Sequence, residues 1–145
     1  MKVSNNSKAS VQGGCLCGKL RYIISGPRRN IIVCHCENCR RSHGHVAAYT
    51  CADKKDIDIQ QSDDSLRWYH DKGPDTFRGF CGDCGASLFW DANDDGGKLS
   101  VSAGSLDNSD DLTIIGHIFV GEKGGYYDVS TGLPVFVKGS AGALG

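Results

Sequence analysis

The 145-residue chain has the length of one ordinary domain, and its 39% hydrophobic content is enough to build a core. A net charge of −1 and a pI of about 6.5 argue against nucleic-acid binding, because domains that bind nucleic acid are usually strongly basic. No apolar run is long enough to span a membrane, and residues 1–12 lack the apolar segment of a secretory signal, so we expect a cytoplasmic location.

The first half of the chain alternates polar turns with short segments of strand-forming residues. Residues 1–12 are polar and predict a flexible arm ahead of the folded domain. A short helix is predicted over residues 37–43. Alternating or β-branched residues predict strands over residues 19–25, 30–33, 46–51 and 56–59.

The second half contains further short strands and no strongly amphipathic helix. Residues 66–70 and 76–80 predict a hairpin through the turn at residues 71–75. Further strands are expected over residues 86–91, 99–103 and 114–120. The Gly- and Ala-rich residues 138–145 predict a flexible tail. With 20 glycines and many short strands, the chain is predicted to be an all-β, sandwich- or barrel-like domain.

Seven of the eight cysteines fall into three tight clusters. A disulfide framework would be the ordinary explanation in a secreted protein. Here the C-x-C and C-x-x-C spacings are too tight for ordinary bridges, and they favour reduced thiolates on metal. Seven thiols indicate two zinc ions, one with four ligands and one with three. The clustered cysteines are Cys15, Cys17, Cys34, Cys36, Cys39, Cys81 and Cys84.

Spacing alone does not divide these ligands between two metals. The outer pairs, Cys15/Cys17 and Cys81/Cys84, are flanked by matching glycines and are candidates for one structural four-thiolate site. The central cluster would then hold a zinc whose open fourth position could take water or a substrate thiol. The alternative is that a fourth protein ligand closes this second site, from among His35, His43, His45 and Cys51.

Residues around the central cluster bear on its chemistry. The predicted helix places Cys36 at a helix N-terminus, where free N–H groups favour a thiolate. His35 is expected to point away from the metal, because alternate residues of an extended segment face opposite ways. Arg40 and Arg41 either offset the charge of the cluster or lie on a solvated helix face. Cys51, outside the clusters, is expected to be a small buried hydrophobe.

Three cysteine-containing segments occur in a specific order: residues 14–18 (GCLCG), 34–40 (CHCENCR) and 80–85 (FCGDCG). Together with residues 104–107 (GSLD), 117–120 (HIFV) and 132–134 (GLP), they resemble the glutathione-dependent formaldehyde-activating enzyme family, which also includes centromere protein V. The resemblance covers residues 13–137. It implies a complex all-β fold of the Mss-four-like kind, stabilised by zinc.

The resemblance also implies a division of the metal ligands. Cys15, Cys17, Cys81 and Cys84 would hold a structural zinc, and Cys34, Cys36 and Cys39 a catalytic one. The activity named for the family is the condensation of formaldehyde with glutathione to S-hydroxymethylglutathione, a carbon–sulfur lyase reaction. Glutathione has two carboxylates, and the cationic side chains considered as their partners are Arg40, Arg41 and Lys54.

Three functions follow as hypotheses. The first is a zinc-dependent carbon–sulfur lyase acting on a glutathione adduct or that of a related thiol. The second is a non-catalytic zinc module that binds or carries glutathione, or that binds a protein partner. The third is thiol redox chemistry at a metal-free cysteine such as Cys51, which ranks last because no general base or resolving partner is apparent for it.

Overall fold

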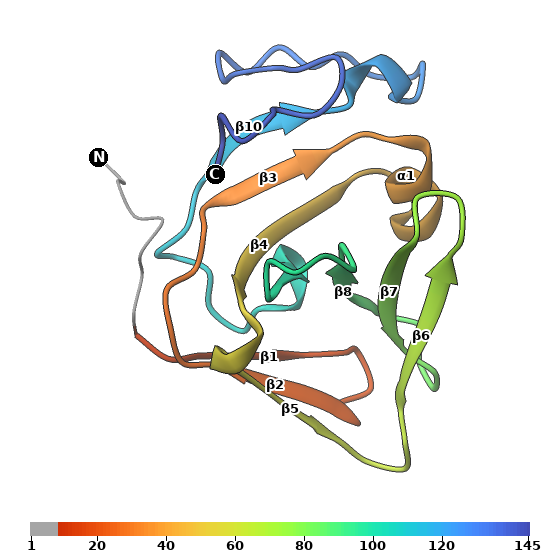
Figure 1. The fold of residues 1–145 in the computed structure, drawn as a ribbon, viewed down its shortest axis with the longest axis vertical. Coiled ribbons are helices and arrows are strands. Elements are labelled where there is room, and N and C mark those ends of the chain that lie inside the picture. The colour runs from red at the N-terminus through yellow and green to blue at the C-terminus, as the bar shows by residue number, and fades with distance from the viewer. Residues whose placement is uncertain (1–8) are drawn as a thin grey trace.

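The computed structural model describes residues 9–145, which form two β-sheets (Figure 1). The smaller sheet has the strand order β1-β2-β5 and is antiparallel. Its strands are β1 (Val11–Gly14), β2 (Leu20–Ile24) and β5 (Ile57–Gln61). The two open sheets confirm the all-β prediction and do not close into a barrel.

The larger sheet has the order β10-β3-β4-β9-β8-β7-β6, and only the β10–β3 pair in it is parallel. Its strands are β3 (Ile31–Cys34), β4 (Ala47–Asp53), β6 (Leu66–Asp71), β7 (Thr76–Cys81), β8 (Ser87–Asp91), β9 (Lys98–Ser102) and β10 (Ile114–Ile118). The helical elements are α1 (Glu37–His43) and the 3-10 turns η1 (Lys54–Asp56), η2 (Ala103–Ser105) and η3 (Val120–Glu122).

The main core is formed by the inward-facing side chains of the smaller sheet and the middle of the larger one. The predicted alternation in β2 is present: Leu20, Tyr22 and Ile24 are fully buried. The ring of Tyr22 meets that of Phe89 edge-on at 5.5 Å between centroids. The buried Tyr22 hydroxyl forms a hydrogen bond with Ser105 Oγ at 2.6 Å. This packing joins the two sheets into one unit.

The N-terminal boundary differs from the prediction. The flexible arm was predicted to reach residue 12, but β1 begins at Val11, pairs with β2 along its length and buries the Val11 side chain. The residues next to Val11 are mostly polar, so its strand depends on pairing with a partner that the local sequence does not reveal. Residues 1–8 of the predicted arm lie outside the described residues.

The C-terminal segment also differs from the flexible tail predicted for residues 138–145. Leu144 is 9% exposed and lies against Gly116 of β10, where a Cβ would come within 2.6 Å of Leu144 Cδ1. The carbonyl of Lys138 accepts a hydrogen bond from Phe119 N at 2.9 Å. The packed part of the chain therefore reaches past the predicted boundary at residue 137.

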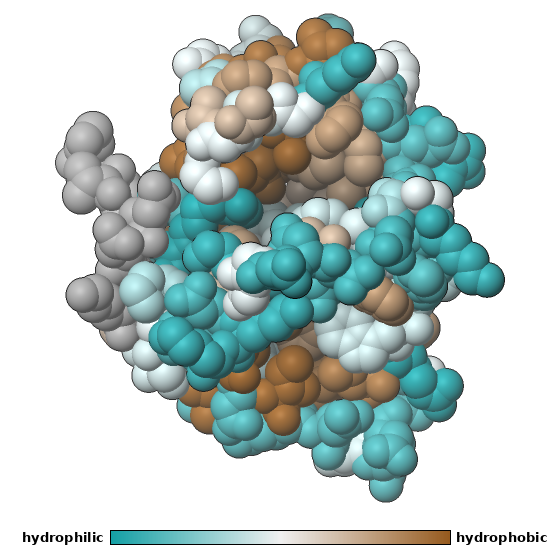
Figure 2. Space-filling model, in the orientation of Figure 1, coloured by the Kyte–Doolittle hydropathy of each residue, from teal (hydrophilic) through white to brown (hydrophobic). Residues whose placement is uncertain are grey.

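The surface is mixed in character. Figure 2 shows hydrophilic side chains across the middle of one face, with hydrophobic side chains gathered towards the β10 end and towards the smaller sheet. Within the described residues, no helix has both the length and the apolar character needed to cross a bilayer.

Candidate metal centres and cavity

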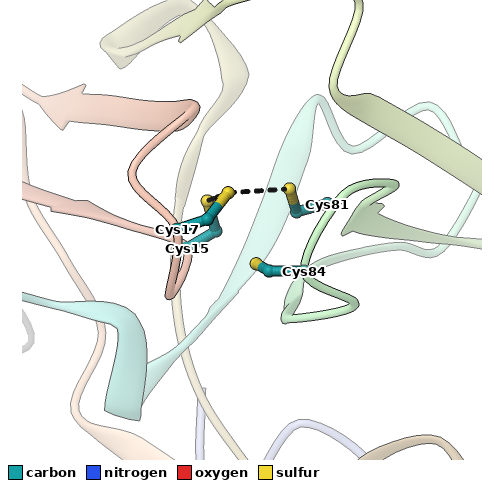
Figure 3. A group of neighbouring side chains, drawn as sticks. All are labelled: Cys15, Cys17, Cys81 and Cys84. Atoms are coloured by element: carbon teal, nitrogen blue, oxygen red, sulfur yellow. Dashed lines mark hydrogen bonds between the residues drawn. The ribbon is translucent and has the colours of Figure 1, made fainter.

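Two tight turns bring four of the predicted cysteine ligands together. Cys15 and Cys17 lie between β1 and β2, and Cys81 and Cys84 lie at the β7–β8 connection, with their sulfur atoms converging (Figure 3). The four Sγ atoms lie within 4.8 Å of one another. The Cys15–Cys17 and Cys17–Cys81 sulfur separations are 3.6 and 3.8 Å. Tetrahedral zinc with Zn–S bonds of about 2.3 Å spaces its sulfurs about 3.8 Å apart. The donor set therefore fits a closed four-thiolate zinc, and the sulfurs are too far apart for disulfides.

The backbone of both turns supports thiolates at this site. Leu20 N donates to Cys15 Sγ at 3.3 Å. The backbone N–H of Ala86 is the main cause that lowers the pKa of Cys84 to about 6. Gly18 and Gly85 have φ values of 87° and 79°, the left-handed region that favours glycine, which explains the glycine after each pair. A metal held here links the smaller sheet to the larger one.

The central cluster forms where β3 passes into α1. Cys34 ends β3, Cys36 is the N-cap of α1, and Cys39 lies in the first turn of the helix. The three Sγ atoms lie within 4.8 Å of one another. Cys36 Sγ accepts a hydrogen bond from Cys39 N at 3.3 Å. Hydrogen bonds from Cys34 and Cys39 lower the pKa of Cys36, whereas the hydrogen bond with Cys36 raises the pKa of Cys34. A cation at the centre would hold all three as thiolates, so the donor set fits a three-thiolate metal site.

His35 points away from this cluster, as its position on an extended segment predicted. It is 2% exposed and lies in a hydrogen-bonded chain: its Nδ1 meets the Tyr127 hydroxyl at 2.5 Å, and its Nε2 meets His117 Nδ1 at 2.9 Å. Burial lowers the pKa of His35 to about 4 and lowers that of His117 as well. Between two neutral imidazoles, the N–H of one ring donates to the unprotonated nitrogen of the other. These hydrogen bonds hold His35 in place, and with it the backbone between Cys34 and Cys36.

The other residues considered as a fourth ligand also lie apart from the three sulfurs. His43 Nε2 is 2.7 Å from the Tyr49 hydroxyl, and His45 Nδ1 bonds the Tyr126 hydroxyl. Cys51 lies in β4 opposite Ser100 and is half-buried. Within the described residues, the group that could hold a second metal consists of Cys34, Cys36 and Cys39 alone.

The three-cysteine cluster borders a cavity of about 390 Å³. The cavity lies between β3–β4, the β7–β8 hairpin and the segment after β10. Its lining is largely apolar or aromatic with a few charged side chains, and includes Arg29, Ile32, Glu37, Asn38, Tyr49, Pro74, Thr76, Arg78, Trp90, Ser100, Ile118, Phe119 and Glu122.

The cations of the lining are not those that the sequence suggested. Arg40 and Arg41 are absent from it. Arg40 Nε donates to the carbonyl of Glu122 at 3.1 Å, and Arg41 pairs with Glu37 on the exposed side of the helix. Lys54 pairs with Asp91 at 2.9 Å, also outside the lining.

The cations that line the cavity are Arg29 and Arg78. Arg78 Nη2 lies 3.6 Å from Cys39 Sγ, and Arg78 Nη1 donates to Ser42 Oγ at 3.1 Å. The alternation of Thr76 and Arg78 on one face of β7 was the signal available in the sequence, since both line the cavity. Arg29 precedes β3 and offered no comparable signal.

Comparison with known proteins identifies the family. The family model described as glutathione-dependent formaldehyde-activating enzyme matches residues 10–122. A solved structure of a Rhodobacter sphaeroides protein from a structural genomics programme has 22% sequence identity and a TM-score of 0.55, covering 68% of this chain and 89% of its own. That likeness concerns the fold. No curated protein matches the chain. Since the family model spans most of the chain, including both cysteine sites, the chain belongs to the glutathione-dependent formaldehyde-activating enzyme family.

Proposed function

We propose that the protein is a zinc-dependent carbon–sulfur lyase that acts on an adduct of glutathione or a related thiol, as in the formation of S-hydroxymethylglutathione. The observation that supports this most is the three-cysteine cluster at the wall of a cavity of about 390 Å³. Cavities of roughly 300–1,000 Å³ are typical of small-molecule sites. A three-thiolate site that borders such a cavity has the form of a catalytic zinc site, which keeps one position open.

The proposal assigns zinc to both cysteine groups. Cys15, Cys17, Cys81 and Cys84 hold a structural ion, and Cys34, Cys36 and Cys39 hold the working ion. Zinc bound by the latter group lowers the pKa of a thiol or polarises a carbonyl. Arg78 contributes through its contact with Cys39 Sγ, because a guanidinium beside a sulfur offsets the negative charge of three thiolates.

The reaction itself is an addition of sulfur to a carbonyl. The thiolate sulfur of glutathione attacks the carbon of formaldehyde, a C–S bond forms, and the C=O π pair moves to oxygen, which then takes up a proton. Tyr49 is the phenol of the lining, and its hydroxyl is 2.7 Å from His43 Nε2. Burial lowers the pKa of His43 to about 4, so the imidazole is neutral at pH 7. We assign Tyr49 the role of hydrogen-bond donor to the developing oxyanion, with neutral His43 in the tautomer that carries its proton on Nε2 and donates to the phenol oxygen.

The test is the rate of adduct formation from ¹³C-formaldehyde and glutathione, followed by NMR exchange spectroscopy with and without zinc-loaded protein. Formaldehyde adds to thiols without a catalyst, so the comparison with buffer alone is the essential control. We expect acceleration by the wild type, retention of it in Cys51→Ser and loss of it in Cys36→Ser. A wild-type rate equal to the buffer rate would refute the enzyme proposal, and saturable glutathione binding without acceleration would indicate a carrier.

The state of the thiols also bears on location. The eight cysteines are all unpaired, and seven of them are arranged as metal ligands. Because reducing compartments preserve such thiols, we propose a cytoplasmic location. Localisation of the tagged full-length protein by microscopy tests this directly.

A further inference from the structure

Arg29 is a half-buried cation in the cavity lining, and no carboxylate of the described residues lies within ion-pair distance of it. Its Nε donates to the Asn30 carbonyl at 3.1 Å, and its Nη2 donates to the Tyr49 carbonyl at 3.0 Å. These backbone contacts fix the guanidinium plane, and its other N–H groups have no acceptor among the described residues. Burial lowers the pKa of Arg29, since desolvation disfavours the charged form.

The other charged side chains of the lining are already engaged. Arg78 contacts Cys39 Sγ and Ser42 Oγ. The Glu37 carboxylate pairs with Arg41 at 2.9 Å, and the Glu122 carboxylate accepts the backbone N–H of Glu37 at 3.0 Å. Arg29 is therefore the lining cation that is left for an anionic group of a ligand.

The position of Arg29 relative to the cysteines follows from the strand register. Cys34 lies opposite Ala47, and the Arg29 guanidinium bonds the carbonyl of Tyr49, two residues further along β4. Two residues of a strand span about 7 Å. A small molecule with its sulfur at the cysteine cluster would thus meet Arg29 several bonds away from that sulfur.

We propose that Arg29 binds a carboxylate of the thiol substrate, so that the site selects anionic thiols such as glutathione over neutral ones. This inference rests on the proposed function and adds to it the residue that sets substrate class. A carboxylate can take two parallel hydrogen bonds from a guanidinium, an arrangement that lysine does not reproduce.

The experiment measures binding rather than turnover. Zinc-loaded wild type, Arg29→Gln, Arg29→Lys and Arg67→Gln are titrated calorimetrically with glutathione, glutathione diethyl ester and 2-mercaptoethanol. Arg67 is exposed on β6 and outside the lining, so it controls for loss of one positive charge. Thermal unfolding and zinc content of each variant show whether the fold and both metals are retained, since Arg29 also bonds the strand backbone.

We expect Arg29→Gln to weaken glutathione binding about 10- to 100-fold, the range for a hydrogen bond between charged groups. Arg29→Lys should lie in between, Arg67→Gln should match the wild type, and the ester and 2-mercaptoethanol should bind all four proteins alike. Wild-type affinity for glutathione in Arg29→Gln, or an equal loss for all three thiols, overturns the role of Arg29 while leaving the proposed function intact. A wild type that binds none of the thiols refutes the proposed function, and this inference with it.

Discussion

Replacement of Cys81 by serine is expected to abolish folding. Cys81 is fully buried and shares its site with Cys17, 64 residues away along the chain. Closing a loop of that length costs the unfolded chain about 4 kcal/mol. The proposed zinc would offset that cost, since structural zinc contributes on the order of 10 kcal/mol or more to folding. Because domains are stable by only about 5–15 kcal/mol in total, loss of one thiol removes most of that margin.

The assay is circular dichroism with thermal unfolding, combined with zinc content by mass spectrometry. We expect wild type to hold two zinc ions per chain and unfold cooperatively. Cys81→Ser should show no cooperative transition, whereas Cys51→Ser, the matched control outside both sites, should behave like wild type. A Cys81→Ser protein that unfolds within a few degrees of wild type, with both zinc ions bound, would refute the structural role of this site.

Three further predictions concern the cavity and His43, which bonds Tyr49 of its lining. Cys36→Ser should keep its cooperative unfolding but hold one zinc per chain, and two bound ions in that variant would contradict the assignment of the second site. Tyr49→Phe should reduce the rate of adduct formation at least 10-fold with unchanged glutathione affinity; an unchanged rate would remove Tyr49 from the mechanism. Burial lowers the pKa of His43 to about 4 in the folded protein, below its value of about 6.5 in the unfolded chain. Between these two pH values the unfolded chain binds one more proton than the folded protein. The free energy of unfolding therefore decreases as the pH falls from about 6.5 to 4. Urea unfolding at pH 7.5 and 5.0 should therefore show a smaller decrease in the free energy of unfolding for His43→Gln than for wild type. Equal decreases in the two proteins would contradict this.

The local elements could be predicted from the sequence because their signals are local. The alternation in β2 and the hairpin of β6 and β7 follow from patterns a few residues long, and α1 was expected over the residues that form it. The three cysteine clusters were equally visible, since ligand spacing within each is short. Each of these features is determined by residues that are close together in the sequence.

The cavity could not be predicted in the same way, because its walls come from segments that are far apart in sequence. Arg29 precedes β3 and Arg78 lies in β7, and both look like ordinary surface cations in the sequence. Arg40 and Arg41 are next to the cluster in sequence, yet the turn of α1 directs them elsewhere. The strand at Val11 and the burial of Leu144 also depend on distant partners.

The hydrogen bonds of His35 have a consequence for the geometry of the three-cysteine cluster. His35 lies between Cys34 and Cys36, and it is held by the Tyr127 hydroxyl and by His117 Nδ1. These two partners lie 92 and 82 residues further along the chain, in the segment after β10 and in β10 itself. The spacing of Cys34 and Cys36 therefore depends on the C-terminal part of the fold as well as on α1. A substitution at Tyr127 would alter the arrangement of the cluster without changing one cysteine.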